Sequence, residues 1–249
     1  MGRRDLPPLR SLPRVFLPGL ETEDVPAFEL PKDEVDKFRK VLRLEEGSFI
    51  AVLPNDGRVI VCEFRARQAW PVETYQPQTE RHRKIILAQA LPKGDRLDTI
   101  LRMGTELGVF KFVLFPAERS VVRWDAEKQR DKVRRFDAIV REAAEQSYRT
   151  RLPAIEFLPS LEAVLKQWPD AAILSELETA TRTLDTVTGP ATVVIGPEGG
   201  WAPREVDLIG DRGITLGPLV LRTDTAGVGV LANLLLSESP GTSHSSNSL

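Results

Sequence analysis

Two glycine-bearing segments, each followed by a predicted helix start, constrain the fold of this chain most strongly. The first begins with the apolar, β-branched run Thr192–Ile195, which favours a strand, and continues into Gly196 and Pro197, which end the ladder and turn the chain. Gly199 and Gly200 then allow backbone groups to approach a ligand without an intervening Cβ. The segment therefore predicts a backbone-built loop at the end of a buried strand.

The second segment, Leu216–Ala226, contains a Gly-Pro turn and leads into a predicted helix. We expect Thr223 or Asp224 to cap this helix, since both side chains can accept hydrogen bonds from backbone N–H groups. Its apolar residues recur at helical spacing, and they are Val230, Leu231, Leu234 and Leu235. Two loops near helix starts predict a cofactor pocket made mainly of backbone.

The residue types in these loops restrict the ligand. A nucleoside triphosphate loop would end in Gly-Lys-Ser or Gly-Lys-Thr, yet neither segment contains lysine. The run Gly227–Ala232 fits the dinucleotide pattern G-x-G-x-x-A, but no acid follows at the expected ribose-binding distance. We interpret Gly227 and Gly229 as sites of close helix packing. An adenosyl compound such as S-adenosylmethionine fits the remaining features, while an ordinary tight turn is the alternative for either loop alone.

Cysteine and histidine content argues against disulfides and metal sites. The single Cys62 cannot form an internal disulfide, and His82 and His244 lie far apart in the 249-residue sequence. No apolar run approaches the length of a membrane span, and no apolar signal segment follows the N-terminal arginines. We therefore expect a cytoplasmic protein with no metal and no membrane partner.

The net charge of −2 argues against a generally basic RNA-binding surface. Basic residues are nevertheless clustered, near the N-terminus, at Arg81–Lys84 and between Arg119 and Arg151. Acids are interleaved in the last cluster, so charge alone favours a solvated helix face over a phosphate-binding one.

The first part of the chain is predicted to form a small β-rich domain, residues 1–77. Strands are expected at residues 14–17, 48–53 and 59–64, with an Asp-Gly hairpin turn between the last two. Residues 32–44 are expected to form a helix that buries Val35, Phe38, Val41 and Leu42. The polar, proline-containing stretch 75–80 is the expected linker.

Residues 78–237 are predicted to form an α/β domain with a mostly parallel sheet, because strands and helices alternate. Expected strands cover 84–90, 110–116, 171–174 and 192–195, and expected helices cover 96–107 and 128–147. The long helix is expected to turn Val133, Phe136, Val140 and Ala143 toward the core. The serine-rich residues 238–249 are expected to be disordered.

Several segments, in order along the chain, resemble the RsmE family of SPOUT-class methyltransferases. The two glycine segments resemble its IGPEGGW and LGPLVLRTDTA signatures. The other matching segments are Val41–Arg43, Thr105–Val109, Glu118–Ser120 and Arg141–Arg149. The resemblance implies a PUA-like β-barrel followed by a SPOUT domain with a trefoil knot, a homodimer, and S-adenosylmethionine-dependent methylation of uridine N3 in 16S ribosomal RNA of the small subunit.

Two departures from the family pattern keep other functions open. Lys37 stands where the family usually has histidine, and Met103 where lysine is common. One alternative is a SPOUT enzyme acting on another RNA, for example by 2′-O-methylation. A second is a non-catalytic RNA-binding assembly factor, which would have no need for both glycine loops.

Candidate site residues follow from the chemistry and the resemblance. Arg222 is expected to stabilise negative charge on the uracil ring unless it pairs with Asp224 or Glu198, and Glu198 is expected to orient an arginine or to act as a base. The candidate cofactor-binding residues are Leu174, Ser175, Ile195, Gly196, Gly199, Leu216, Gly217, Leu221 and Thr225. The candidate RNA-binding residues are Arg14, Lys37, Arg43, Arg119, Gln146 and Arg149.

Overall fold

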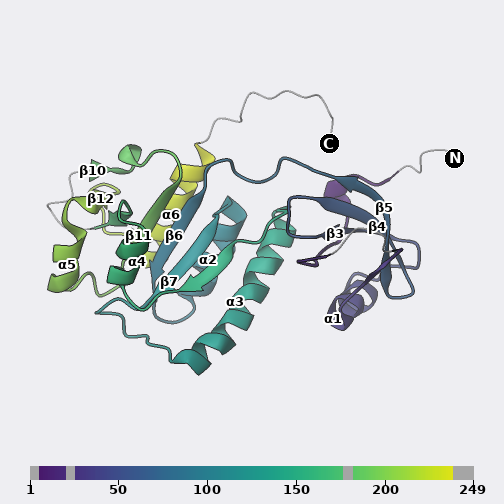
Figure 1. The fold of residues 1–249 in the computed structure, drawn as a ribbon, viewed down its shortest axis with the longest axis horizontal. Helices are drawn as coiled ribbons and strands as arrows, with labels where there is room; N and C mark the ends of the chain where they lie inside the picture. The colour runs from purple at the N-terminus through teal and green to yellow at the C-terminus, as the bar shows by residue number, and fades with distance from the viewer. Residues whose placement is uncertain (1–5, 21–25, 176–181, 238–249) are drawn as a thin grey trace. The chain divides into compact units, whose positions relative to one another are not determined.

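Alternating hydrophobic strands and helices form a mixed α/β structure with two separate sheets (Figure 1). A computed structural model describes residues 6–20, 26–175 and 182–237. The chain forms two compact units: one holds the described residues up to Glu80 together with Ala144–Leu152, and the other holds Arg81–Ala143 and the described residues from Pro153. The proposed domains 1–77 and 78–237 stay a prediction, and residues 238–249 lie outside the described residues.

The first unit contains a curled five-stranded sheet with the order β1-β3-β4-β5-β2. Its elements are η1 (Leu9–Ser11), β1 (Arg14–Phe16), β2 (Phe28–Glu29), α1 (Lys32–Asp36), the π-helical η2 (Lys37–Val41), β3 (Phe49–Leu53), β4 (Val59–Arg65) and β5 (Gln68–Tyr75). The β3–β4 hairpin confirms the predicted turn: Asn55 and Gly57 have positive φ, and the Asp56 carboxylate accepts the Arg58 N–H at 2.9 Å.

One prediction about this unit is wrong. The expected helix 32–44 is α1 followed by a π-turn, and it buries Val35 and Phe38 but leaves Val41 and Leu42 exposed. β5 was not among the predicted strands, and it ends at Tyr75, where the predicted linker 75–80 begins. Its Pro71 lies where the pairing with β4 shifts register, which is one of the few positions where a paired strand tolerates the missing N–H.

The second unit contains a seven-stranded sheet with the order β10-β12-β9-β11-β6-β7-β8, and every pairing is parallel. This confirms the predicted parallel α/β sheet. Its strands are β6 (Ile85–Ala90), β7 (Lys111–Phe115), β8 (Ala154–Phe157), β9 (Ala172–Leu174), β10 (Arg182–Thr183), β11 (Ala191–Ile195) and β12 (Gly213–Thr215). Its helices are α2 (Arg96–Leu107), α3 (Ala126–Gln146), α4 (Leu161–Gln167), η3 (Leu184–Thr186), α5 (Pro203–Ile209), η4 (Gly210–Arg212) and α6 (Thr223–Leu236).

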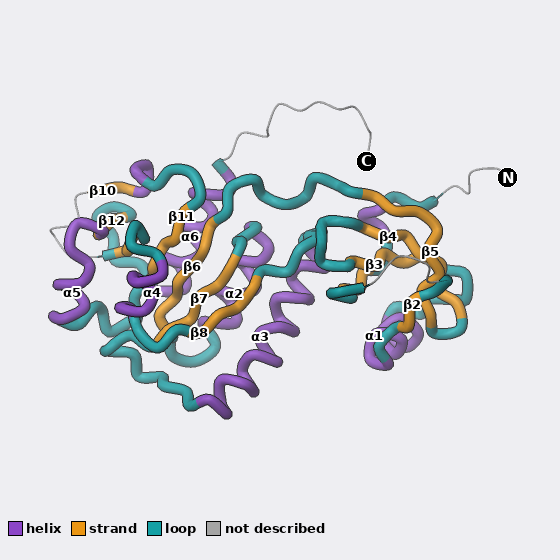
Figure 2. Tube along the Cα trace, viewed as in Figure 1, coloured by secondary structure: helices purple, strands orange, loops and turns teal. Residues whose placement is uncertain are grey.

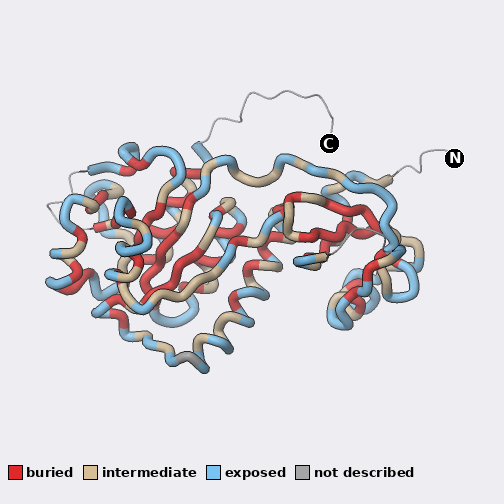
Figure 3. The backbone as a smooth tube through the Cα atoms, viewed as in Figure 1, coloured by how far each residue is buried: buried red, intermediate tan, exposed pale blue. Residues whose placement is uncertain are grey.

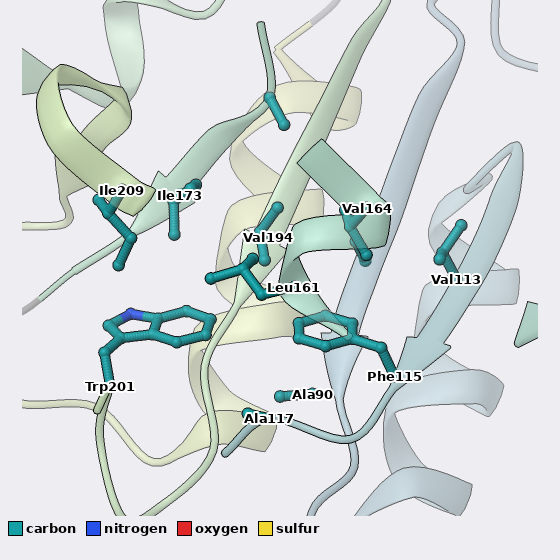
Figure 4. Packing of buried hydrophobic residues seen from close by; sticks show 12 residues of the cluster. Ala90, Val113, Phe115, Ala117, Leu161, Val164, Ile173, Val194, Trp201 and Ile209 are labelled. Atoms are coloured by element: carbon teal, nitrogen blue, oxygen red, sulfur yellow. The ribbon is translucent and has the colours of Figure 1, made fainter. Parts of the chain in front are cut away.

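Helices lie on both faces of this sheet (Figure 2). α2 packs against α6, and α6 packs against β6 and β11. On the other face, α4 and α5 cover a cluster that includes Phe115, Val194 and Trp201 (Figure 4). The strands are the most deeply buried part of each unit (Figure 3). The long helix α3 buries Phe136, Val140 and Ala143 as predicted, while Val133 is half-buried.

Three glycines of α2 and α6 differ in how closely neighbouring side chains approach them. A Cβ on Gly227 would lie 3.2 Å from Gln89 Oε1, which confirms close packing there, but Gly229 has no neighbour within 4 Å, so the same prediction for Gly229 is wrong. A Cβ on Gly104 of α2 would lie 2.9 Å from the Phe112 ring and 3.1 Å from the Leu231 side chain. Gly104 is therefore the position where an added Cβ would force its neighbours to move, and Gly227 is tightly packed.

Gly104→Ala is expected to lower the free energy of unfolding, measured in urea. Overpacking typically costs about 1–3 kcal/mol, which outweighs the helix-propensity gain of about 1 kcal/mol. Gly229→Ala is the matched control, because its open surroundings leave only the propensity gain and predict a stabilised protein. Equal stabilisation by both substitutions would contradict the packing described for Gly104.

Candidate functional site

A pocket of about 580 Å³ lies at the carboxyl edge of the parallel sheet of the second unit. Adjacent strands β9 and β11 place Leu174 and Ile195 at this edge, where the loops after β6, β7 and β12 also emerge. Ligands of open α/β sheets bind beyond the carboxyl ends of the strands. The lining residues are Arg96, Arg119, Leu174, Ile195, Gly196, Pro197, Glu198, Gly200, Trp201, Val220, Leu221, Arg222, Thr223 and Ala226.

The first glycine loop folds back over its own strand. The Trp201 indole N–H donates to the Leu174 carbonyl at 3.1 Å, and Gly200, at φ +67°, donates its N–H to Pro197. A Cβ on Gly196 would lie 3.0 Å from the Trp201 indole. The absence of a side chain at Gly196 is therefore needed for the close approach of Trp201. From the sequence, we had expected Gly196 to leave room for the ligand.

The second loop leads into α6, but the predicted cap is wrong. The helix begins at Thr223 with Arg222 at the N-cap position, and no side chain caps it. The Thr223 hydroxyl donates instead to the Gly196 carbonyl at 2.8 Å and accepts the side-chain N–H of the fully buried Gln89 at 2.9 Å. This bond fastens the start of α6 to the first loop, so both predicted loops contribute to one pocket.

Three arginines line the pocket, and their partners differ. The Arg119 guanidinium donates to the Gly199 carbonyl at 3.3 Å. Arg96, the first residue of α2, forms an ion pair with Glu198, and its Nε lies 4.0 Å from Asp224 Oδ1. Among the residues that the structure describes, the exposed Arg222 guanidinium has no ion pair or hydrogen bond. The expected alternative, in which Arg222 pairs with Glu198 or Asp224, is therefore not found.

Glu198 holds two segments of the pocket wall together. Its carboxylate accepts the Lys93 backbone N–H at 3.0 Å in addition to the Arg96 guanidinium. The following helix α5 is capped by Glu205, whose carboxylate accepts the Ala202 N–H at 3.0 Å. Of the roles considered for Glu198, orienting an arginine is the one that the contacts support, and that arginine is Arg96.

The structure brings together seven of the residues selected from the sequence for cofactor, catalysis or RNA. These residues line the pocket: Arg119, Leu174, Ile195, Gly196, Glu198, Leu221 and Arg222. The other five cofactor candidates are absent from its lining, and they are Ser175, Gly199, Leu216, Gly217 and Thr225. Ser175 is buried beside the pocket edge, where its N–H donates to the Ile214 carbonyl at 3.0 Å. Gly217 forms a turn in which its N–H donates to the Thr215 hydroxyl.

Sequence reasoning missed Arg96 as a site residue. The available signal was its position at the predicted start of a helix that follows a parallel strand, since such positions lie at the carboxyl edge of the sheet. Trp201 was part of a recognised segment, but its contact with Gly196 could not be read from spacing.

Two predicted RNA contacts are buried within the first unit and are corrections to the sequence interpretation. Arg14 is 8% exposed, its guanidinium lies 4.5 Å above the centre of the Tyr148 ring, and burial lowers its pKa. Arg149 is 6% exposed and donates to the Glu80 carboxylate at 2.9 Å. Both arginines are held by internal contacts, because the short Ala144–Leu152 segment packs within this unit.

The other candidates of the first unit remain accessible to different degrees. Lys37 forms ion pairs with Glu145 at 2.8 Å and Glu34 at 3.2 Å. Burial alone would lower the pKa of Lys37, but these two carboxylates outweigh it and the pKa is raised. Arg43, at φ +53°, and Gln146 are exposed. Their RNA contacts stay predictions.

The described residues contain neither a metal-binding cluster nor a membrane-spanning helix. No group of three or more His, Cys, Asp or Glu side chains there could hold a metal ion. Burial raises the pKa of the Cys62 thiol to about 12, so it is protonated at neutral pH. None of the helices in the described ranges is long and apolar enough to cross a bilayer.

Comparison with known proteins adds independent information about this site. The family model described as RNA methyltransferase domain matches residues 79–235. The ribosomal RNA small subunit methyltransferase E of Bacillus subtilis is 33% identical over 234 residues, which cover 83% of this chain and 88% of the relative.

Solved structures agree with this match. A structure from Legionella pneumophila in complex with the cofactor SAM has a TM-score of 0.80 and 26% identity, with 89% of this chain and 97% of that chain covered. The ribosomal RNA small subunit methyltransferase E of Neisseria gonorrhoeae, bound to S-adenosyl methionine, has a TM-score of 0.76 and 27% identity over 89% and 96% of the two chains. With the sequence match extending from the parallel sheet into the first unit, the chain belongs to the RsmE family of RNA methyltransferases.

Proposed function

We propose that this protein transfers a methyl group from S-adenosylmethionine to N3 of a uridine in 16S ribosomal RNA of the small subunit. One observation carries the proposal: a single pocket combines backbone-lined apolar walls with an arginine, Arg222, that has no ion pair among the described residues. Membership of the RsmE family and the SAM-bound relatives support the choice of cofactor and RNA.

The pocket residues fit an adenosyl cofactor. Leu174, Ile195 and Leu221 offer apolar side chains, and backbone groups on either side of Gly196 provide hydrogen-bonding partners. The lining contains no lysine and no glycine-rich phosphate loop, as expected for a ligand without a phosphate run. We assign Leu174, Ile195, Gly196 and Leu221 to the cofactor, with Ser175, Gly199, Leu216, Gly217 and Thr225 as the supporting layer around them.

The reaction requires stabilisation of charge on the uracil ring. S-adenosylmethionine supplies an activated methyl group on its sulfonium. N3 of uridine carries a proton, and its transfer to solvent water leaves negative charge shared between N3 and the two ring oxygens. N3 would then bond to the methyl carbon as the methyl–sulfur bond breaks, which releases S-adenosylhomocysteine. Arg222 would donate hydrogen bonds to one of these oxygens, and a donor aimed at developing charge inside a pocket typically contributes most to such catalysis. Glu198 would act through Arg96, and Arg119 would contact the RNA beside the first loop.

We also propose the finer structural features that the family resemblance implies. The curled sheet of the first unit would be a PUA-like RNA-binding barrel, with Lys37, Arg43 and Gln146 as candidate contacts. A trefoil knot would lie in the second unit. A homodimer is supported by Leu219 and Val220, which expose apolar side chains beside the pocket. The enzyme would act in the cytoplasm, on ribosomal subunits.

Methyl transfer to three RNA substrates tests the proposed function. Purified protein and methyl-labelled S-adenosylmethionine are incubated with unmethylated small subunits, naked 16S RNA and transfer RNA. The proposal predicts labelling of ribosomal RNA only. Preferential labelling of transfer RNA would favour a different SPOUT substrate, and cofactor binding by calorimetry without transfer to any RNA would favour a non-catalytic assembly factor.

A further inference from the structure

Arg96 lies where three segments of the pocket wall meet. It begins α2, directly after the loop that follows β6, and its guanidinium lines the pocket. One partner, Glu198, belongs to the first glycine loop, and the other, Asp224, lies in the first turn of α6. One guanidinium therefore connects the loop after β6, the loop after β11 and the start of α6.

The two acids depend on Arg96 to different extents. Glu198 also accepts the Lys93 N–H, so its carboxylate keeps one partner without Arg96. Asp224 Oδ1 is buried and accepts no hydrogen bond from the described residues, and its contact with Arg96 Nε is at the 4.0 Å limit of an ion pair. A buried carboxylate oxygen without a partner is costly, so Asp224 would gain from any second cation nearby.

Arg222 is the pocket arginine whose guanidinium has no ion pair or hydrogen bond among the described residues. It lines the same pocket as Glu198 and precedes Asp224 by two residues. Both acids are instead directed to Arg96, while Arg222 stays exposed and has no ion pair among the described residues. Arg96 thus contacts both acids, and Arg222 remains available to a ligand.

We propose that Arg96 is a positioning residue that holds Glu198 and Asp224 and so keeps the Arg222 guanidinium available for a bound ligand. Without Arg96, Arg222 would pair with Glu198 or Asp224, because Arg119, the other remaining arginine of the pocket, donates to the Gly199 carbonyl. The consequence for catalysis rests on the proposed function, but the redistribution of ion pairs does not, and the two can be measured separately.

Chemical labelling of Arg222 tests the ion-pair redistribution without an activity assay. The full-length protein is treated with phenylglyoxal, which modifies arginines according to their accessibility and freedom from ion pairs, and the rate at Arg222 is followed by peptide mass spectrometry. Arg96→Gln is expected to slow labelling of Arg222. Adding Glu198→Gln and Asp224→Asn to Arg96→Gln is expected to restore it, because no acid remains to pair with Arg222.

Arg135→Gln is the matched control. Arg135 forms an ion pair with Asp98, which also lies in the first turn of α2, but neither residue lines the pocket. The control should leave Arg222 labelling unchanged. An Arg222 rate in folded Arg96→Gln equal to that in the control would overturn the proposal, as would a triple variant no faster than Arg96→Gln. If thermal unfolding shows that Arg96→Gln is not folded, Arg96→Met, which also removes the charge, replaces it, and an unchanged Arg222 rate there again overturns the proposal.

Kinetics then connect the labelling to function. Arg96→Gln is expected to lower kcat by about 10- to 100-fold, the loss typical of a displaced catalytic group, with little change in the cofactor Kd. Arg96→Lys should recover part of kcat, since it keeps a charge near Glu198. If the unmodified protein transfers no methyl group but Arg222 labelling responds as predicted, the proposed function fails and the positioning role of Arg96 stands.

Discussion

Replacing Arg222 by glutamine is expected to lower kcat for methyl transfer by about 10²–10³-fold, the usual cost of removing a donor that faces developing charge. The pocket offers the reason: Arg96 is committed to Glu198, and Arg119 donates to the Gly199 carbonyl, whereas Arg222 has no such partner among the described residues. The cofactor Kd, measured by calorimetry, should change little, because apolar and backbone groups supply most of the proposed cofactor contacts. Rates are measured at saturating RNA and cofactor.

Arg204→Gln is the control for the loss of one positive charge. Arg204 lies on α5, is largely exposed, and forms a 3.5 Å ion pair with Glu162. Its removal should leave kcat within a few-fold of the original value. A kcat for Arg222→Gln as high as that of Arg204→Gln would exclude the proposed role in charge stabilisation. A large loss of cofactor affinity in Arg222→Gln would instead place its guanidinium on the cofactor.

Gly196→Val is expected to weaken cofactor binding by about 100-fold or more and to lower the free energy of unfolding by about 1–3 kcal/mol, as overpacking usually does. The Cβ alone would lie 3.0 Å from the Trp201 indole, so the ring must move. That movement would break the indole hydrogen bond to the Leu174 carbonyl and disturb the Gly196 carbonyl that accepts the Thr223 hydroxyl. Calorimetry of S-adenosylmethionine binding and urea unfolding measure the two effects.

A graded series separates packing from a general effect of removing glycine. Gly196→Ala should lie between the original protein and Gly196→Val in both measurements. Gly229→Ala, on the open side of α6, should bind cofactor normally. Normal cofactor binding by folded Gly196→Val would mean that the cofactor site lies outside this pocket.

The parallel sheet and the pocket position were predictable because both depend on local patterns. β-branched runs such as Thr192–Ile195 alternate with helical repeats, and the carboxyl ends of parallel strands share one edge. Residues at these strand ends and at the start of the following helix therefore lie near one edge, which is why Leu174, Ile195 and Arg222 were found together.

Other features depend on contacts between distant residues and could not be read from spacing. Thr223 has the side chain of a helix cap but uses its hydroxyl for Gly196, across 27 positions of sequence. Arg14 and Arg149 have the charge of RNA contacts, yet Tyr148 and Glu80 hold them inside the first unit. Charge alone cannot distinguish a buried, paired arginine from an exposed one.

Nucleoside mass spectrometry of the methylated RNA tests the proposed chemistry most directly. Unmethylated small ribosomal subunits are treated with the protein and isotopically labelled S-adenosylmethionine, and the 16S RNA is digested to nucleosides. Labelled 3-methyluridine, formed far more slowly when Arg222→Gln is used, is the predicted result. A label on a ribose 2′-oxygen, or on any base other than uridine, would contradict methylation of uridine N3.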